Sequence, residues 1–186
     1  MNKITPRALG AALLTTCLAA TAAQSAGSHA GGHGHSEAEA DIGTPAATSA
    51  ANREVRVSMG EMFFEPARID VEQGETVRFV VTNAGDFVHE FALGTAAMHG
   101  AHAAEMSRMM EAGVIGGGQI HHDMMEEAGM MHQDPNSLLL EPGETGTLTW
   151  TFDGDAALEL SCNVPGHRES GMQGELRLHE ARADGS

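Results

Sequence analysis

The sequence predicts an all-β fold, a Greek-key β-sandwich that carries a long, partly helical insertion rich in Met and His. Three observations predict it: short segments that alternate polar and apolar residues, turn signals between them, and connections long enough for a Greek key. The chain has 186 residues, the length of one ordinary domain with a short extension.

The expected strands lie between residues 55 and 179. Residues 55–59 and 68–72 alternate, and residues 76–82 are β-branched and partly alternating. Later strands are expected at 137–140, 145–152, 157–162 and 175–179. Gly, Pro, Asn and Asp mark turns between them at 73–75, 83–86, 141–144 and 153–155. We therefore place the sandwich domain at residues 54–180, followed by a tail at 181–186.

Residues 95–136 interrupt this pattern. They contain eight Met and five His and do not read as strands. Residues 105–111 could form two helical turns with Met106, Met109 and Met110 on one face. An excursion of about forty residues between strands is usually functional or disordered.

The N-terminus has the pattern of a secretory signal peptide, expected over residues 1–26. Lys3 and Arg7 precede an apolar run, and small residues follow, so cleavage is expected between Ala22 and Ala26. The apolar run is shorter than the ~20 residues that span a bilayer. Acylation at Cys17, as in a lipoprotein, is the alternative. We expect export to the periplasm, with residues 27–53 as a flexible His-containing tether because they are too polar and small to form a core.

The charge of the chain excludes one class of partner. Lys and Arg number 10 and Asp and Glu 26, which gives a net charge of −16, and removal of residues 1–26 would change it to −18. Phosphate contacts need clustered Lys and Arg, so no nucleic-acid partner is expected. Export would also leave Cys162 as the single cysteine, which must then be buried and inert or held by a partner.

The segment around Cys162 has the residue types of a soft-metal site. His167 follows Cys162 by five residues and Met172 follows His167 by five, and Pro and Gly let the intervening loop turn back. His89, just after the strand expected at 76–82, is the candidate for a fourth ligand. Two His, one Cys thiolate and a weak axial Met form the ligand set of a blue-copper electron-transfer site.

Here the sequence resembles the cupredoxins, the blue-copper proteins. The Cys-x4-His-x4-Met spacing is similar to that of rusticyanin and auracyanin, and Val-Pro-Gly-His, Gly-Met-x-Gly and Val-His-Glu-Phe resemble the exported bacterial cupredoxins linked to copper tolerance. The resemblance implies an eight-stranded Greek-key sandwich with Cu(II)/Cu(I) bound by His89, Cys162, His167 and Met172.

One position departs from the family pattern. Many members have Asn after the first His ligand, where it donates a hydrogen bond toward the ligating sulfur, and this chain has Glu90. An ionised Glu side chain has no donor. Because such hydrogen bonds tune the centre, the departure leaves the reduction potential and the colour open.

Plainer interpretations of the same residues stay open. Cys162 could be an inert core thiol, Met172 could be core packing, and His89 alone could be structural. Structural zinc prefers Cys and His without a thioether. A binuclear centre would need two cysteines in one loop, and a multicopper oxidase would need His-Cys-His runs, which the chain lacks.

The insertion also has two interpretations. It could be a Met-rich surface or partner-binding loop, or it could hold a second soft-metal site, because thioethers select Cu(I) or Ag(I). The candidate ligands are Met106, Met109, Met110, His121 and His122. In the tether, His29, His33 and His35 could capture Cu(II) loosely or remain solvated.

Three functions follow from these patterns. The first is a periplasmic cupredoxin for copper tolerance, which binds copper at one type 1 site, cycles it between Cu(I) and Cu(II), and binds additional Cu(I) in the insertion. The alternative is a dedicated electron-transfer carrier to a cytochrome or reductase, with the insertion as docking surface. A stand-alone oxidase of cuprous ion is the third, although one copper cannot by itself reduce oxygen by four electrons. We expect no enzyme, no membrane span and a monomer.

Overall fold

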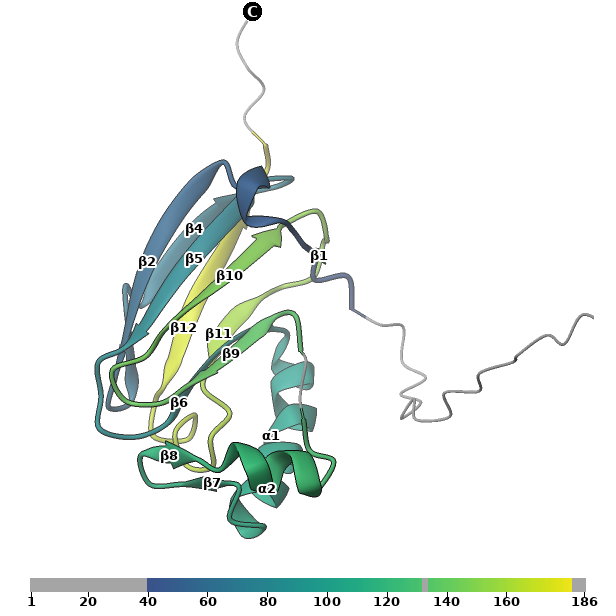
Figure 1. Cartoon of the computed structure of the whole chain (residues 1–186). Coiled ribbons are helices and arrows are strands. Elements are labelled where there is room, and N and C mark those ends of the chain that lie inside the picture. Colours follow the sequence, from purple (N-terminus) through teal and green to yellow (C-terminus); the bar gives the residue numbers. More distant parts are fainter. Residues whose placement is uncertain (1–39, 132–133, 182–186) are drawn as a thin grey trace, which may run out of the picture. The chain divides into compact units, whose positions relative to one another are not determined.

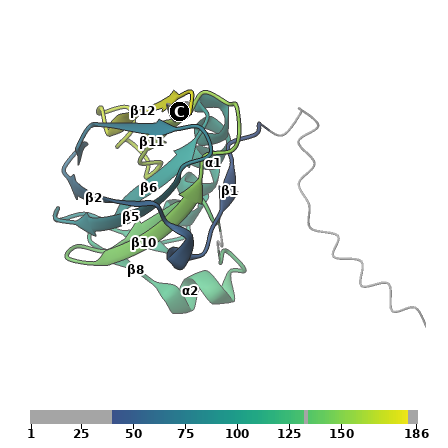
Figure 2. The same ribbon diagram turned by 90° about the horizontal axis from the view of Figure 1, so that it is seen from above.

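The computed structural model describes residues 40–131 and 134–181. Two five-stranded sheets pack face to face (Figures 1 and 2). The first sheet has the order β1 (Thr44–Pro45), β10 (Thr145–Thr151), β5 (Thr76–Asn83), β2 (Arg53–Gly60) and β3 (Phe63–Glu65). The second has the order β4 (Arg68–Glu72), β12 (Gln173–His179), β11 (Glu159–Ser161), β6 (His89–Gly94) and β9 (Ser137–Leu140).

This architecture confirms the predicted β-sandwich. β2 pairs with β5 and β4 with β12 in parallel, whereas the other pairs in the two sheets are antiparallel. The described residues form ten strands in these sheets instead of the eight that the resemblance implied, and β1 and β3 are only two and three residues long.

Most strands lie where alternation and turn signals predicted them, but β6 was missed. β4 and β9 have the predicted bounds. All six residues of β6 are buried, including His89 and Glu90. A strand that is covered on both faces does not alternate, so periodicity could not reveal it.

Aromatic side chains join the two sheets. Phe91 of β6 lies 5.4 Å from Phe79 of β5 and 6.1 Å from Phe64 of β3, measured between ring centroids. Phe152 packs on Phe79 in turn, and all four rings are at most 1% exposed. Each buried ring of this kind contributes roughly 1.5–3 kcal/mol to stability. This core supports the β6 end at which His89 stands.

The insertion is more ordered than the sequence indicated. It forms α1 (Ala96–Glu111), the hairpin β7 (Ile115–Gly116) and β8 (Gln119–Ile120), and α2 (His122–Glu127). The expected two turns at 105–111 are the end of a 16-residue helix, which begins after Thr95, whose side chain accepts a hydrogen bond from the Met98 N–H at 3.3 Å. Buried residues from every part of the insertion join the main core: Met106, Met109, Val114, Ile115, Ile120 and Met125.

The flexible tether expected over residues 27–53 is wrong for its last part. Thr44–Pro45 pair with β10, residues 48–50 form a 3-10 helix, and the Trp150 indole donates to the Ile42 carbonyl at 2.8 Å. Composition alone suggested disorder, yet this segment gains its order from the edge of a sheet that the rest of the chain provides. The expected signal peptide, His29, His33 and His35 lie outside the described residues.

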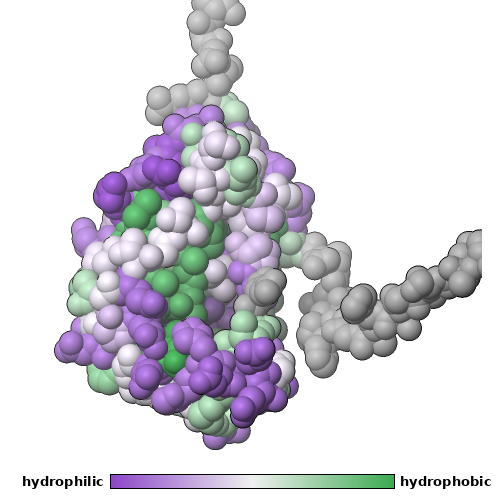
Figure 3. Space-filling model, viewed as in Figure 1, coloured by the Kyte–Doolittle hydropathy of each residue, from purple (hydrophilic) through white to green (hydrophobic). Residues whose placement is uncertain are grey.

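Figure 3 shows one face of the molecule, on which an apolar strip runs between polar areas where β9 and β10 lie near each other. Among the described residues, no helix has the length and apolarity needed to cross a bilayer.

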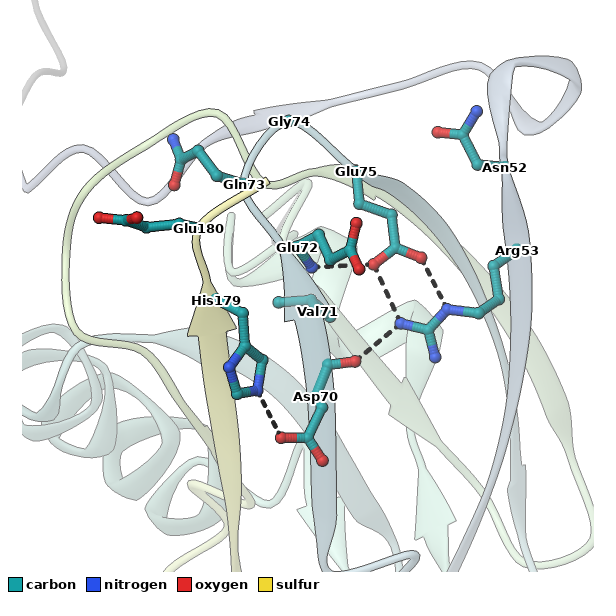
Figure 4. A pocket seen from close by; sticks show the side chains of 10 residues that line it. All are labelled: Asn52, Arg53, Asp70, Val71, Glu72, Gln73, Gly74, Glu75, His179 and Glu180. Carbon is teal, nitrogen blue, oxygen red and sulfur yellow. Dashed lines mark hydrogen bonds and ion pairs between the residues drawn. The ribbon is translucent and has the colours of Figure 1, made fainter. Parts of the chain in front are cut away.

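β12 finishes at the end of the sandwich away from the insertion (Figure 1). A hollow lies there, lined by the residues shown in Figure 4. Its charged side chains largely pair with one another: Arg53 binds Glu75 at 2.6 Å, and His179 lies 2.7 Å from Asp70. These exposed pairs account for the side chains that meet in Figure 4. Pairs of this kind contribute little to stability.

Candidate metal centre

The loop between β11 and β12 brings Cys162, His167 and Met172 to the end of the sandwich that carries the insertion (Figure 1). The His167 N–H donates to the Val164 carbonyl at 3.0 Å, and the Met172 N–H donates to the His167 carbonyl at 3.0 Å. Gly171, at φ 102°, takes a backbone conformation that other residues rarely adopt. The predicted sharp return of this loop is therefore observed.

Arg168 fastens the same loop to β11. Its guanidinium donates to the Ser161 hydroxyl at 2.8 Å and to the Glu159 carboxylate at 2.5 Å. These bonds join residues before Cys162 to a residue after it, and so hold the main chain of the loop in one conformation.

His89 is positioned by a second fixed loop, between β5 and β6. The Asn83 side chain donates to the Phe87 carbonyl at 2.8 Å and the Leu140 carbonyl at 2.9 Å, and accepts from the Gly85 N–H at 3.0 Å. Asp86 N–H also donates to the Glu61 carboxylate at 2.5 Å. His89 is consequently held at the start of β6, where it is fully buried.

Three donor atoms from these loops converge. His89 Nδ1 lies 3.1 Å from His167 Nδ1, which lies 3.4 Å from Cys162 Sγ. Ligand atoms of all three residues are within 4.8 Å of one another. A metal ion about 2.0–2.1 Å from imidazole nitrogens and about 2.3 Å from a thiolate keeps its donors ~3–4 Å apart, so the observed spacing fits one ion.

The protonation of these residues also suits a metal. Burial lowers the pKa of both His89 and His167, and for His89 the neighbouring His167 lowers it further, so both rings are neutral with a free lone pair near neutral pH. Burial raises the pKa of the Cys162 thiol to about 12. Binding of a metal ion must therefore displace the thiol proton.

Met172 is a buried neighbour of Cys162 in the loop between β11 and β12. It is fully buried, belongs to the core cluster with Cys162 and Val164, and its carbonyl accepts a hydrogen bond from the Cys162 N–H at 3.2 Å. His89 Nε2 is buried and has no hydrogen-bond partner among the described residues, and the nearest carboxylate, Glu61, is 3.9 Å away. That carboxylate favours a proton on Nε2, which leaves Nδ1 as the ligating nitrogen.

Glu90 donates a hydrogen bond to the sulfur of Cys162 through its main chain, although its side chain has no donor. Its main-chain N–H, which any residue supplies, donates to Cys162 Sγ at 3.3 Å. Its carboxylate is 2% exposed and accepts from the Asn163 N–H at 3.1 Å and the Asn163 side chain at 2.7 Å. Glu90 directly follows His89 and Asn163 directly follows Cys162, so these hydrogen bonds join the two segments that carry the ligands.

His102 of α1 completes this buried network. Its Nε2 lies 2.9 Å from the Glu90 carboxylate, and its Nδ1 faces Glu105 at 3.6 Å and Asp134 at 3.9 Å. Burial by itself would lower the pKa of His102, but the Glu90 hydrogen bond and the three carboxylates outweigh it and raise the pKa to about 9. The insertion is thereby linked electrostatically to the centre.

Replacing His102 by Gln is expected to remove a pH-dependent part of the stability. The pKa of His102 is about 9 in the folded protein and about 6.5 in the unfolded chain, so protonated His102 stabilises the folded state. This contribution is complete below pH ~6.5 and is lost as the pH rises through 9. The linked free energy is up to about 3 kcal/mol. Urea unfolding at pH 6, 7.5 and 9 should show a steeper decline for the unsubstituted protein than for His102→Gln.

The exposed His179–Asp70 pair supplies the matched control. His179→Gln removes a pair of the same chemistry at the other end of the sandwich, where contributions are about 0–1 kcal/mol. Equal pH dependence in all three proteins would contradict the role assigned to His102.

The residues predicted for a second site do not all come together. Met106, Met109 and His122 line one pocket with Met125, Met131 and His102. Met110, 39% exposed, and His121, also exposed, are not among its lining residues. Met106, Met109 and Met110 do share one side of α1, as residues three and four apart on a helix must, but Met110 lies at its exposed edge and does not line the pocket.

Several residues of the centre were missed because they bind no metal themselves. Asn83 was only part of a turn signal, and Asn163, His102 and Glu61 were not singled out. Asn163 directly follows Cys162, which was the one available signal. The other contacts join residues far apart in the chain, so spacing could not reveal them.

A Greek-key sandwich with a buried Cys and two neutral His at one end defines the class of small blue-copper proteins, the cupredoxins. The comparison with protein families agrees: residues 51–179 match the family of copper binding proteins that includes plastocyanin and azurin. The chain belongs to this family, and its cofactor is copper.

Two relatives of this chain belong to one group within the family, the copper-resistant cuproproteins CopI. The chain is 44% identical over 147 residues to the copper-resistant cuproprotein CopI of Pseudomonas aeruginosa, covering 73% of this chain and 81% of that protein. It is 40% identical over 141 residues to CopI of Rubrivivax gelatinosus, covering 75% and 74%.

Solved structures agree on the fold. Auracyanin B has a TM-score of 0.54 at 20% identity, over 76% of this chain and 99% of that chain. Reduced auracyanin of Roseiflexus castenholzii has a TM-score of 0.52 at 17% identity, over 69% and 98%. The sequence had indicated this resemblance from the spacing of the loop that follows β11.

Proposed function

We propose that the protein holds one copper ion at a type 1 centre through His89, Cys162 and His167, with Met172 as a weak axial ligand. The convergence of the three donor atoms within 4.8 Å carries this assignment. When bound, copper supplies a one-electron Cu(II)/Cu(I) couple, for which soft sulfur and imidazole ligands are suited.

The residues around the donors limit rearrangement and exclude water. Cys162, His89 and Met172 are fully buried, and Asn83 and Arg168 clamp the two loops that carry them. The half-buried His167 is the ligand nearest to solvent. A frame of this kind favours electron movement at the His167 edge with little change of structure.

The role that we propose is copper tolerance in the periplasm. The named relatives are copper-resistant cuproproteins, and the expected signal peptide fits export. A net charge of −18 after cleavage attracts cations, and the Met and His of the insertion suit additional Cu(I). The protein would bind excess copper and cycle it between Cu(I) and Cu(II).

Titration of the copper-free protein with Cu(I) under anaerobic conditions is expected to give more than one tightly bound equivalent. A chromogenic Cu(I) chelator in competition measures the number and the affinity of the sites. The type 1 donors account for one equivalent, and the insertion is the expected site of any other tightly bound Cu(I). A total of one equivalent would remove the sequestration role.

Electron transfer to a cytochrome or reductase is the second candidate, and one contact favours it. Phe87 is 46% exposed, and its ring lies 6.5 Å from the ring of His167, which places an apolar contact surface beside the ligand nearest to solvent. A protein that binds one Cu(I) and exchanges electrons rapidly with a soluble cytochrome would fit this role instead.

Deletion of the insertion is a poor test of either role. Six of its side chains belong to the core cluster, and the Leu93 N–H donates to the Asn136 carbonyl at 2.9 Å where the insertion returns. A deleted protein could fail through loss of packing alone. Substitutions that conserve side-chain volume within the insertion are therefore the better test.

A further inference from the structure

A second pocket, separate from the type 1 donors, lies between the insertion and the second sheet. Its volume is about 330 Å³. Both helices of the insertion, β8, β6 and β9 contribute to its walls. The lining residues used below are Met106, Met109, Met125, Met131, His122, His102, Glu90 and Asp134.

Three buried methionines, from both helices of the insertion, line this pocket. Met106 and Met109 of α1 are 1% exposed, and Met125 of α2 is 7% exposed. Met106 and Met109 stand three residues apart on one helix face, so their side chains are neighbours. Met131, 55% exposed, and exposed His122 lie at the rim, where an ion could enter.

The charged groups of the pocket are already engaged with one another. One Glu90 oxygen bonds His102 and the other bonds Asn163. The uncharged soft donors are therefore the groups suited to bind an ion.

We propose that Met106, Met109 and Met125 bind one Cu(I) ion in this pocket, with Met131 and His122 at its mouth. This inference rests on the proposed copper-tolerance function and gives the additional Cu(I) a location. Uncharged, polarizable thioethers prefer Cu(I) to Cu(II) and to hard cations. Met110 and His121 take no part.

The competing explanation is that these methionines only fill the core. Leu for Met conserves volume and usually costs less than about 1.5 kcal/mol, so it keeps the packing and removes the sulfur. The triple substitution Met106→Leu, Met109→Leu and Met125→Leu therefore separates the two explanations. The matched control replaces three methionines of the insertion that do not line the pocket: Met110→Leu, Met124→Leu and Met130→Leu.

Anaerobic Cu(I) titration is expected to show one equivalent fewer in the pocket triple variant than in the unsubstituted protein and the control. Equivalently, its additional site should weaken by more than about 100-fold, since loss of an outer partner alone costs about 10–100-fold. The intense visible band of the Cu(II)-loaded protein should persist in all three. Equal stoichiometry and affinity in the pocket variant and the control would overturn the proposal.

A measurement on the unsubstituted protein guards against misfolding of the variant. With [13Cε]methionine labelling, addition of Ag(I), a redox-inactive soft monovalent ion, should shift the methyl signals of Met106, Met109 and Met125. The signal of Met59, buried in the core on β2, should not move. Shifts confined to exposed methionines would also overturn the proposal.

The two levels of the hypothesis fail in different ways. Absence of the visible band from the copper-loaded protein would refute the type 1 centre and leave the pocket result standing. A retained band together with an unchanged Cu(I) count in the pocket variant would refute the pocket alone.

Discussion

Replacement of Cys162 by Ser is expected to abolish the intense visible absorption of the copper-loaded protein. That absorption requires a thiolate bound to Cu(II), and Sγ of Cys162 is the sulfur that lies 3.4 Å from His167 Nδ1. A serine hydroxyl is a hard, weakly acidic donor and cannot replace the soft thiolate. Visible absorption and paramagnetic resonance spectra measure the loss, and circular dichroism checks that the sandwich persists.

Ser161→Ala is the matched control for this substitution. Ser161 is the neighbouring residue, is equally buried, and bonds Arg168 rather than the three donors. We expect it to keep the band. If Cys162→Ser kept the absorption as well, the ligand assignment would be wrong.

Replacement of Asn83 by Ala is expected to lower the free energy of unfolding by about 3 kcal/mol and to speed the loss of copper. The substitution leaves the buried carbonyls of Phe87 and Leu140 without their donor and frees the loop that leads into His89. Urea unfolding measures the first effect, and transfer of copper to a chelator measures the second.

Asn52→Ala provides the comparison at the other end of the sandwich. The Asn52 side chain accepts one hydrogen bond, from the Thr76 N–H at 3.0 Å, and is exposed. We expect a loss of about 1 kcal/mol and no change in copper release. Equal copper release from both variants would show that Asn83 supports the fold without positioning His89.

Local patterns predicted the parts of the fold that have a solvated face. β4 and β9 were placed at their observed bounds because alternation and turn residues act within a few positions. β6 was invisible to the same reasoning, since it is buried on both faces. The order of residues 44–50 was missed because it depends on pairing with β10, a hundred residues away.

The candidate centre divides in the same way. Cys162, His167 and Met172 lie in one loop, so their spacing in the sequence was enough to predict them. His89 was then predicted because these three residues left one ligand of the site missing. The Glu90 network could not be predicted, because a carboxylate next to a ligand looks unfavourable until His102 and Asn163 are seen to satisfy it. In the insertion, composition indicated soft donors, but only the packing of both helices distinguishes Met125 from Met124.

The direction of β12 has a practical consequence. The strand leaves the Met172 loop and runs seven residues to His179, roughly 20 Å away at about 3.3 Å per residue. A linker fused beyond that strand would immobilise the protein on an electrode with its His167 edge turned outward. Such an oriented film would slow direct electron transfer between the copper and the support while leaving the His167 edge accessible to dissolved redox proteins.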